Sequence, residues 1–287
     1  MEKQQSDRPV KNSPAMKFKK IWLSLLMLVI LFLTGVYFWI SSPLSYTINL
    51  GNGVKMKMLF VKAGSFTMSE KDEENYPGTE ISHRVTLTKN FYIGQFEVTQ
   101  AQYQQVMGNN PSNIKKGTWY PVESVTWNDA MAFCEKLNSM NLAPAGYKFT
   151  LPTETQWEYA AKGGVKSKHY KYSGSNEIEN VAWYWDNAEK TTHEVGSKAP
   201  NEIGVYDMSG NVFEWCLDDW VEDSSKLTAE FYRNNEKEEG PRQERGGSWA
   251  SGCAWDCRSM TRDSVPSSFV SSDLGFRVAL VLAKQAF

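Results

Sequence analysis

The chain has few of the residue patterns that usually identify an enzyme. It has only three histidines, His83, His169 and His193, and none of them has the spacing of a zinc site. There is no G-x-S-x-G motif, no phosphate-binding loop, no internal repeat and no low-complexity tract. The formal net charge of -2 gives no indication of nucleic-acid binding. The common hydrolase, zinc-enzyme and nucleotide-dependent classes are therefore disfavoured.

One long uncharged segment lies near the amino terminus. Residues 21–40 read IWLSLLMLVILFLTGVYFWI, and a helix of that length just crosses the hydrocarbon core of a bilayer. Lys17, Lys19 and Lys20 precede it, so we expect the amino-terminal end in the cytoplasm. A cleaved signal peptide is the alternative, but the segment ends in bulky aromatic residues without a good cleavage site.

These features predict a cytoplasmic tail over residues 1–20 and a transmembrane signal anchor over 21–40. A spacer over 41–53 follows, and then an extracytoplasmic domain over 54–287, in the periplasm or at the cell surface. Disulfide bonds can form there.

The sequence of the extracytoplasmic part predicts an irregular, loop-rich α+β domain. Strand-type residues occupy 55–68, 84–89 and 91–98. Three short helices have clear start signals, because a threonine at each start is followed three residues later by Gln or Asp; these threonines are Thr99, Thr126 and Thr153. Beyond residue 165 no long amphipathic helix is expected.

The stretch 204–216, GVYDMSGNVFEWC, combines a turn with two acids. Ser209-Gly210-Asn211 is a turn signal, and Asp207 and Glu214 stand on either side of it. A bent loop can direct both carboxylates and its own carbonyls inward, which is how calcium is commonly held. The alternative is an ordinary surface turn with two solvated acids.

Several segments, in order along the chain, resemble one family. They are FTM at 66–68, YIG at 92–94, EVT at 97–99, PV at 121–122, VTW at 125–127, DA at 129–130, LPTE at 151–154, WEYAA at 157–161, the stretch 204–216, RGGSW at 245–249 and GFR at 275–277. Together they are similar to the formylglycine-generating enzyme, or sulfatase-modifying factor, family.

The resemblance implies a C-type-lectin-like fold with bound calcium. One family calcium site uses the positions of Asp207 and Glu214 and the carbonyls of Gly210 and Val212. A second family site begins near Asn180 and Val181, with Asp186 and Asn187 as weak further candidates.

The resemblance also implies a chemistry that this chain does not match. Family enzymes oxidise a sulfatase cysteine to formylglycine with oxygen and copper(I), which two cysteines hold. Soft thiolates suit copper(I). The corresponding positions here are Ser251 and Asp256, or Ala254 in a second alignment, so no thiolate pair results. We therefore expect a non-catalytic branch of the family and no copper.

The four cysteines leave two alternatives open. Cys253 and Cys257 could form a shifted copper site, with Ser248 lining the pocket as a family serine does. The non-catalytic branch instead implies a structural disulfide between Cys216 and Cys257. Cys134 is expected to be a free buried thiol.

Two departures and one aromatic cluster concern the family cleft. Phe213 and Asp273 stand where Trp and Asn are usual in the enzymes. Trp183, Trp185, Phe213 and Trp249 could line a groove, although large aromatic residues are buried at least as often.

The sequence thus predicts a membrane-anchored, calcium-stabilised domain that binds a peptide, protein or glycan outside the cytoplasm, or that takes part in a cell-envelope assembly. The alternative is a copper-dependent formylglycine-generating oxidase that works through Cys253 and Cys257.

Overall fold

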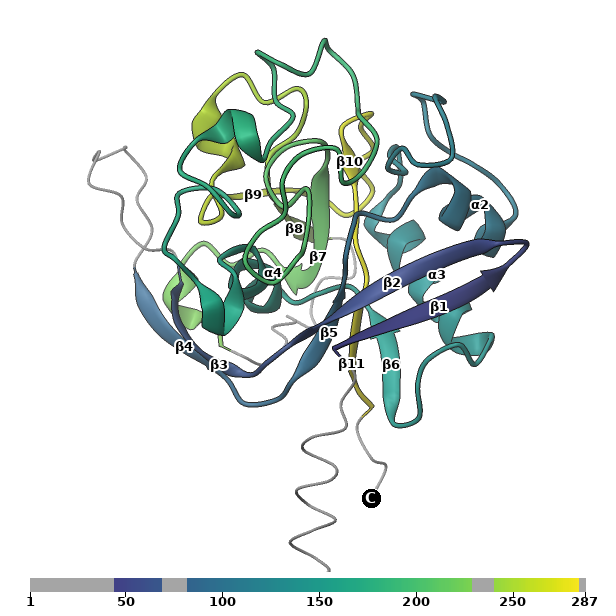
Figure 1. Ribbon diagram of the computed structural model, residues 1–287, viewed down its shortest axis with the longest axis horizontal. Helices are drawn as coiled ribbons and strands as arrows, with labels where there is room; N and C mark the ends of the chain where they lie inside the picture. Colours follow the sequence, from purple (N-terminus) through teal and green to yellow (C-terminus); the bar gives the residue numbers. More distant parts are fainter. Residues whose placement is uncertain (1–43, 69–81, 229–239, 284–287) are drawn as a thin grey trace, which may run out of the picture. The chain divides into compact units, whose positions relative to one another are not determined.

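A computed structural model describes residues 44–68, 82–228 and 240–283 (Figure 1). The predicted tail and membrane anchor lie outside these residues. Within the described ranges, no helix is both long and apolar enough to cross a membrane.

The described part of the chain is a mixed α/β fold with three sheets and short helices. Its strands are β1 (Ser45–Gly51), β2 (Val54–Val61), β3 (Gly64–Met68), β4 (His83–Leu87), β5 (Phe91–Gly94), β6 (Tyr147–Thr150), β7 (Phe213–Asp219), β8 (Pro241–Arg245), β9 (Arg262–Pro266), β10 (Leu274–Gly275) and β11 (Ala279–Leu282). Its α-helices are α2 (Gln100–Met107), α3 (Trp127–Ser139) and α4 (Glu154–Ala161). Four 3₁₀ turns complete the set: η1 (Gly164–Lys166), η2 (Ile178–Asn180), η3 (Ser224–Lys226) and η4 (Ala254–Cys257).

The largest sheet has the order β1-β2-β5-β11-β6, and all its neighbouring strands are antiparallel. β11, near the carboxyl end of the chain, therefore pairs between β5 and β6. A second sheet has the order β10-β7-β8-β9, and β3 pairs with β4 alone. α2 lies beside β1 and β2, α3 lies against α2 and β6, and α4 lies next to β7 (Figure 1).

All three helices begin at the predicted threonines. Each threonine hydroxyl accepts a hydrogen bond from the backbone N–H three residues later, and the side chain of that residue accepts one from the threonine N–H. These reciprocal capping boxes confirm the predicted starts. α2 ends at Gly108, which has a left-handed φ of 85°, again as expected.

Two boundaries differ from the prediction. The expected spacer 41–53 contains a strand, β1, because Ile48 and Leu50 alternate with exposed Thr47 and Asn49 and place two apolar side chains in the core. The strand expected over 91–98 ends at Gly94, since the chain beyond it turns away to contact the loop that ends at Glu214.

Two hydrophobic clusters form most of the interior. The larger one lies between the five-stranded sheet and α2 and α3, where Tyr103 stacks on Phe133 at 5.5 Å between ring centroids. The second gathers around Trp157 of α4 and includes Cys216 of β7. The loops after residue 165 contain little regular secondary structure, so polar contacts stabilise much of their conformation.

Candidate functional site

The stretch 204–216 is a sharply bent loop with its acids inside. Asp207, Gly210 and Asn211 have left-handed φ values of 58°, 77° and 62°. A side chain at Gly210 would collide with the Trp183 carbonyl. Asp207 is 4% exposed and Glu214 is 0% exposed, so the surface-turn alternative is wrong and the inward-facing one is confirmed.

Each carboxylate of this loop already has protein partners. Both Glu214 oxygens accept from Arg277, at 2.6 Å each, and Oε2 also accepts from the Trp157 indole N–H at 2.7 Å. Asp207 Oδ2 accepts from the Gly196 N–H at 2.6 Å. The loop is thereby tied to α4 and to the segment before β11.

Glu97 is a third buried acid at this loop, and the sequence analysis missed it as a site residue. Its carboxylate accepts from the Val212 N–H at 3.1 Å and from the Asn211 side-chain amide at 2.7 Å. The only feature of the sequence that could have indicated Glu97 is that it is a single acid among strand-type residues, in the EVT motif. Its partners lie more than 110 residues away, so no local pattern could identify them.

Three buried acids thus face one arginine. Burial, followed by the charges of Asp207 and Glu214, raises the pKa of Glu97 well above its ordinary value. Burial raises the pKa of Asp207 to about 6. The acids therefore exceed the single cation, Arg277, and the excess has to be offset by bound protons or by a cation.

The predicted ligands have the oxygen atoms that calcium prefers, but one of them is already bonded to a protein cation. Asp207 and the loop carbonyls are oxygen donors of the right kind. Glu214, however, is engaged by Arg277. Nowhere in the described residues are three or more His, Cys, Asp or Glu side chains grouped so as to hold a metal ion.

At the predicted second calcium position, two of the four candidate residues already have protein partners. The Asn180 carbonyl accepts from the Ala199 N–H at 2.9 Å, and Val181 is buried. Asn187 donates to Glu179 and to the Ala182 carbonyl. Asp186 is exposed. Calcium at either position stays a prediction.

A separate cleft of about 270 Å³ lies where β8 turns toward η4 and β9. Its wall is rich in hydroxyl and carboxylate groups and includes Ser248, Ser251, Asp256, Asp263 and Asp273, with Phe213 contributing one aromatic face.

The turn that shapes this cleft depends on Gly247. Gly247 has a φ of 71°, and a Cβ there would lie 2.7 Å from the Cys257 sulfur. Ser248 follows directly and donates from Oγ to Asp273 Oδ2 at 2.7 Å, while its N–H donates to Ser251 Oγ at 3.0 Å. The serine predicted to line the pocket is therefore in the cleft, where its hydroxyl orients the carboxylate of Asp273.

The cleft also contains both positions at which the resemblance implies copper-binding cysteines. Ser251 and Asp256 line its wall, whereas Cys253 and Cys257 do not. Cys253 is exposed, and Cys257 is buried with its pKa raised to about 12 by burial. Neither thiol of the shifted copper pair therefore lines the cleft.

The predicted disulfide is absent from the structure. All four cysteines are free thiols. Cys216 lies in the cluster around Trp157, whereas Cys257 packs with Tyr172 and Tyr184. The pairing was wrong because separate hydrophobic clusters bury the two sulfurs. Cys134 is a free buried thiol on α3, as expected.

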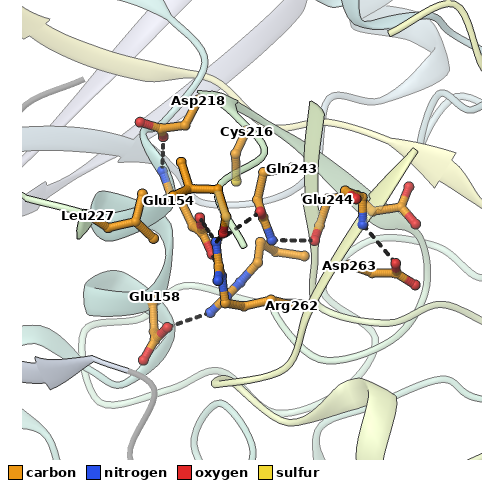
Figure 2. Close-up of polar contacts among 12 residues, drawn as sticks. Glu154, Glu158, Cys216, Asp218, Leu227, Gln243, Glu244, Arg262 and Asp263 are labelled. Carbon is orange, nitrogen blue, oxygen red and sulfur yellow. Dashed lines mark hydrogen bonds and ion pairs between the residues drawn. The ribbon is translucent and has the colours of Figure 1, made fainter. Parts of the chain in front are cut away.

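A network of buried ion pairs (Figure 2) adjoins the cleft, because Arg262 belongs to both. Arg245 bonds Glu154 at 2.9 Å and Glu158 at 2.6 Å, and Arg262 bonds Glu154 at 2.5 Å. The Glu154 N–H donates to Asp218 (Figure 2). Arg262 is also the one arginine among the residues that line the cleft. Its positive charge is already matched by Glu154.

Only one member of the predicted aromatic groove lines this cavity, namely Phe213. Trp183 stacks on His193 at 3.8 Å between ring centroids, and Lys198 lies 4.0 Å from its centroid. Trp249 is half-buried and donates to the Ser272 carbonyl. Trp185 is 47% exposed on a segment that meets Ser251.

The fold and the cleft together define a class. The described part of the chain is a mixed α/β fold with curled sheets and few helices, and it matches solved structures of the same fold. One such structure, Treponema denticola variable protein 1, is 32% identical with a TM-score of 0.72, covering 83% of this chain and 99% of that chain.

The sequence comparisons identify the family. A family profile described as Sulfatase-modifying factor enzyme 1-like domain matches residues 52–282. The chain therefore belongs to the sulfatase-modifying factor family, as the motifs predicted.

The similar proteins include both active and inactive members by name. The chain is 34% identical to a protein named chaperone protein LppX of Paenibacillus barcinonensis, over 76% of this chain and 85% of that protein. It is 31% identical to an inactive Cα-formylglycine-generating enzyme 2 of Bos taurus, over 72% and 65% respectively. It is 26% identical to a formylglycine-generating enzyme of Mus musculus, over 78% and 74%.

Proposed function

We propose that the domain binds a segment of another protein in the cleft at Ser248 and does not oxidise it through copper. The observation that carries this proposal is the presence of Ser251 and Asp256 in the cleft wall, at the two positions where thiolates are expected in the enzymes. A hydroxyl and a carboxylate are hard donors that suit copper(I) poorly. They are well suited to hydrogen-bond or attract a polypeptide.

The remaining cysteines do not supply a substitute. A copper(I) site needs two thiolates that can approach one ion. Burial, followed by the charge of Asp256, holds Cys257 in its protonated form at neutral pH, and Cys253 stands exposed outside the cavity. These two thiols suit copper(I) poorly, and this supports a binding role without copper chemistry.

Two relatives support a binding role by their names. One is called a chaperone protein, and another is called an inactive member of the enzyme family. A chaperone-like domain of this kind would hold a client protein or contribute to an assembly in the cell envelope.

The test is a direct search for the oxidase product. The full-length protein is loaded with copper(I), then given oxygen and a Cys-x-Pro-x-Arg peptide, and the peptide is weighed by mass spectrometry. We expect no aldehyde. An aldehyde that disappears in Cys253→Ser or Cys257→Ser would overturn the proposal and establish an oxidase with a shifted site.

We further propose that residues 21–40 anchor the chain in a membrane with the domain outside the cytoplasm. The support is the uncharged segment and the lysines before it. Fractionation and protease treatment of intact cells test this. Recovery of the full-length chain in the soluble fraction would contradict it.

We also propose that calcium stabilises the loop that contains Asp207. The support is the excess of buried acid over Arg277. Millimolar calcium should then raise the melting temperature relative to a chelated sample, and less so in Asp207→Asn. Equal melting temperatures with and without calcium would show that Arg277 and bound protons suffice.

A further inference from the structure

Four acids gather at or beside the cleft, and Arg262 is the one cationic side chain among its described lining residues. Asp256, Asp263 and Asp273 line it directly. Glu244 of β8 lies beside the cleft, close enough to Asp263 and Asp273 for their charges to raise its pKa. In the strand register Glu244 is directly opposite Asp263 of β9, so the two side chains are on one face of the sheet. Figure 2 shows both side chains on the side of β8 that faces away from Glu154. Like charges in that arrangement are destabilising.

Glu244 is the most unusual of these acids. Its residue is only 5% exposed, yet its carboxylate has neither a hydrogen bond nor an ion pair with any residue that the structure describes. Burial, followed by the charges of Asp263 and Asp273, raises its pKa to about 8. An acid that is almost wholly buried beside two other acids is costly to ionise, and this cost needs an explanation.

The neighbouring cation does not provide that explanation. Arg262 lines the cleft, but its guanidinium spans both oxygens of Glu154, at 2.5 and 3.0 Å, and donates to the Val221 carbonyl as well. Asp273 accepts from the hydroxyls of Ser248 and Ser271, which orient its carboxylate without neutralising it. The cleft therefore keeps a net negative charge.

The size and surroundings of the cleft indicate what it can take. About 270 Å³ is below the roughly 300–1,000 Å³ that is typical of small-molecule sites. A single inserted side chain is a better match. Trp185 donates its backbone N–H to the carbonyl of cleft residue Ser251 and is 47% exposed, so its ring is available to pack against a residue next to the inserted one.

We propose that the cleft selects a cationic side chain, lysine or arginine, of a bound polypeptide, through Asp263, Asp273 and the deeper Glu244. This inference rests on the proposed function and names the ligand class of the same site. A guanidinium suits the arrangement particularly well, because its planar donors bond two carboxylates at once. A neutral glycan would leave the acids uncompensated.

The test uses a positional library of acetylated, amidated hexapeptides on the full-length protein, with neutral oligosaccharides as a second arm. Peptides with arginine or lysine at one position should bind at least about tenfold more tightly than those with glutamine, a ratio worth about 1.4 kcal/mol. Asp263→Asn should remove most of that preference. Asp263 is exposed, so this variant is expected to fold, and Asp256→Asn serves as a second variant.

A matched control and three outcomes make the test decisive. Glu135→Gln removes one exposed acid from α3, outside the cleft, and should leave the preference unchanged. Basic selectivity lost in Asp263→Asn but kept in Glu135→Gln supports the inference. Peptide binding without basic selectivity, or with selectivity unchanged in Asp263→Asn, overturns the inference and leaves the proposed function standing. Binding of oligosaccharides alone, or of no probe, overturns both.

Discussion

Two groups of buried acids lie close together in this domain and differ in how they are neutralised. Glu154 and Glu158 on α4 meet Arg245 and Arg262 at 2.5 to 2.9 Å, and no charge among them is left unmatched. Glu244, one residue before Arg245 on β8, has no such partner among the residues that the structure describes. Successive residues of a strand point to opposite faces of the sheet. β8 therefore has the ion-pair network on one face and the acidic cleft, whose negative charge is not neutralised, on the other.

The comparison teaches that acid content alone does not identify a functional site. The paired acids connect α4 to the four-stranded sheet and hold the fold. The unpaired acids cost stability, and a cost of that kind is typical of a binding site. The two groups should therefore respond in opposite directions to substitution.

The largest expected effect comes from breaking the paired group. Arg245→Met removes the cation between Glu154 and Glu158 and leaves buried charge uncompensated, so the free energy of unfolding should fall by roughly 3–5 kcal/mol. Denaturant unfolding measures it. Arg84→Met, at an exposed position of β4, is the control and should change stability by no more than about 0.5 kcal/mol. A small loss in Arg245→Met would show that the network contributes little.

The opposite sign is expected for the unpaired group. The pKa of Glu244 is about 8 in the fold and near 4.5 in the unfolded chain, so stability from its protonated form is present below about pH 4.5 and is lost as the pH rises through 8. Glu244→Gln keeps the neutral form and should raise the free energy of unfolding by roughly 2–4 kcal/mol at pH 9, with little change at pH 4. Destabilisation of the variant at pH 9 would refute the account of Glu244 as an unpaired acid.

Salt should separate the two groups further. Exposed Asp263 acts partly through solvent, so raising sodium chloride from 50 to 500 mM should weaken binding of an arginine peptide about fivefold. The buried pairs are screened much less, and the free energy of unfolding should change by under about 1 kcal/mol. Titrations at several salt concentrations measure both. Salt-independent binding would place the contact outside the acidic cleft.

The smallest effect on the fold concerns the thiols. Cys253 should react with a thiol reagent in the native protein, whereas Cys134, Cys216 and Cys257 should react only after unfolding, because they are buried. Mass spectrometry after a short labelling pulse counts the modified sites. Protection of Cys253 by oxidation, reversed by a reductant, would indicate a disulfide that the structure does not contain.

Local chemistry made part of the fold predictable. The threonines at 99, 126 and 153 could be identified as helix starts because each cap is completed within three residues. The bend at Gly210 could be predicted for the same reason. β1 was missed because its alternation of Ile48 and Leu50 is short and follows a polar segment.

The site was predictable only where a family motif covers it. Ser251 and Asp256 were identified by their distance from the Gly-Gly-Ser motif, and both line the cleft. Glu244 and Asp263 were not, because their meeting depends on the pairing of β8 with β9, and no sequence pattern expresses that register. The Cys216–Cys257 pairing was wrong since it was taken from the resemblance rather than from three-dimensional contacts.

Proton release on peptide binding tests the central claim most directly. Near pH 7 the Glu244 carboxyl is mostly protonated, given its pKa of about 8, and an arriving guanidinium should lower that pKa. Calorimetric titration of an arginine hexapeptide in buffers of different ionisation enthalpy should therefore show release of up to about one proton per peptide, and none in Glu244→Gln. Binding with no proton release, or with equal release in wild type and Glu244→Gln, would contradict the claim that the unpaired acid is held for a cationic ligand.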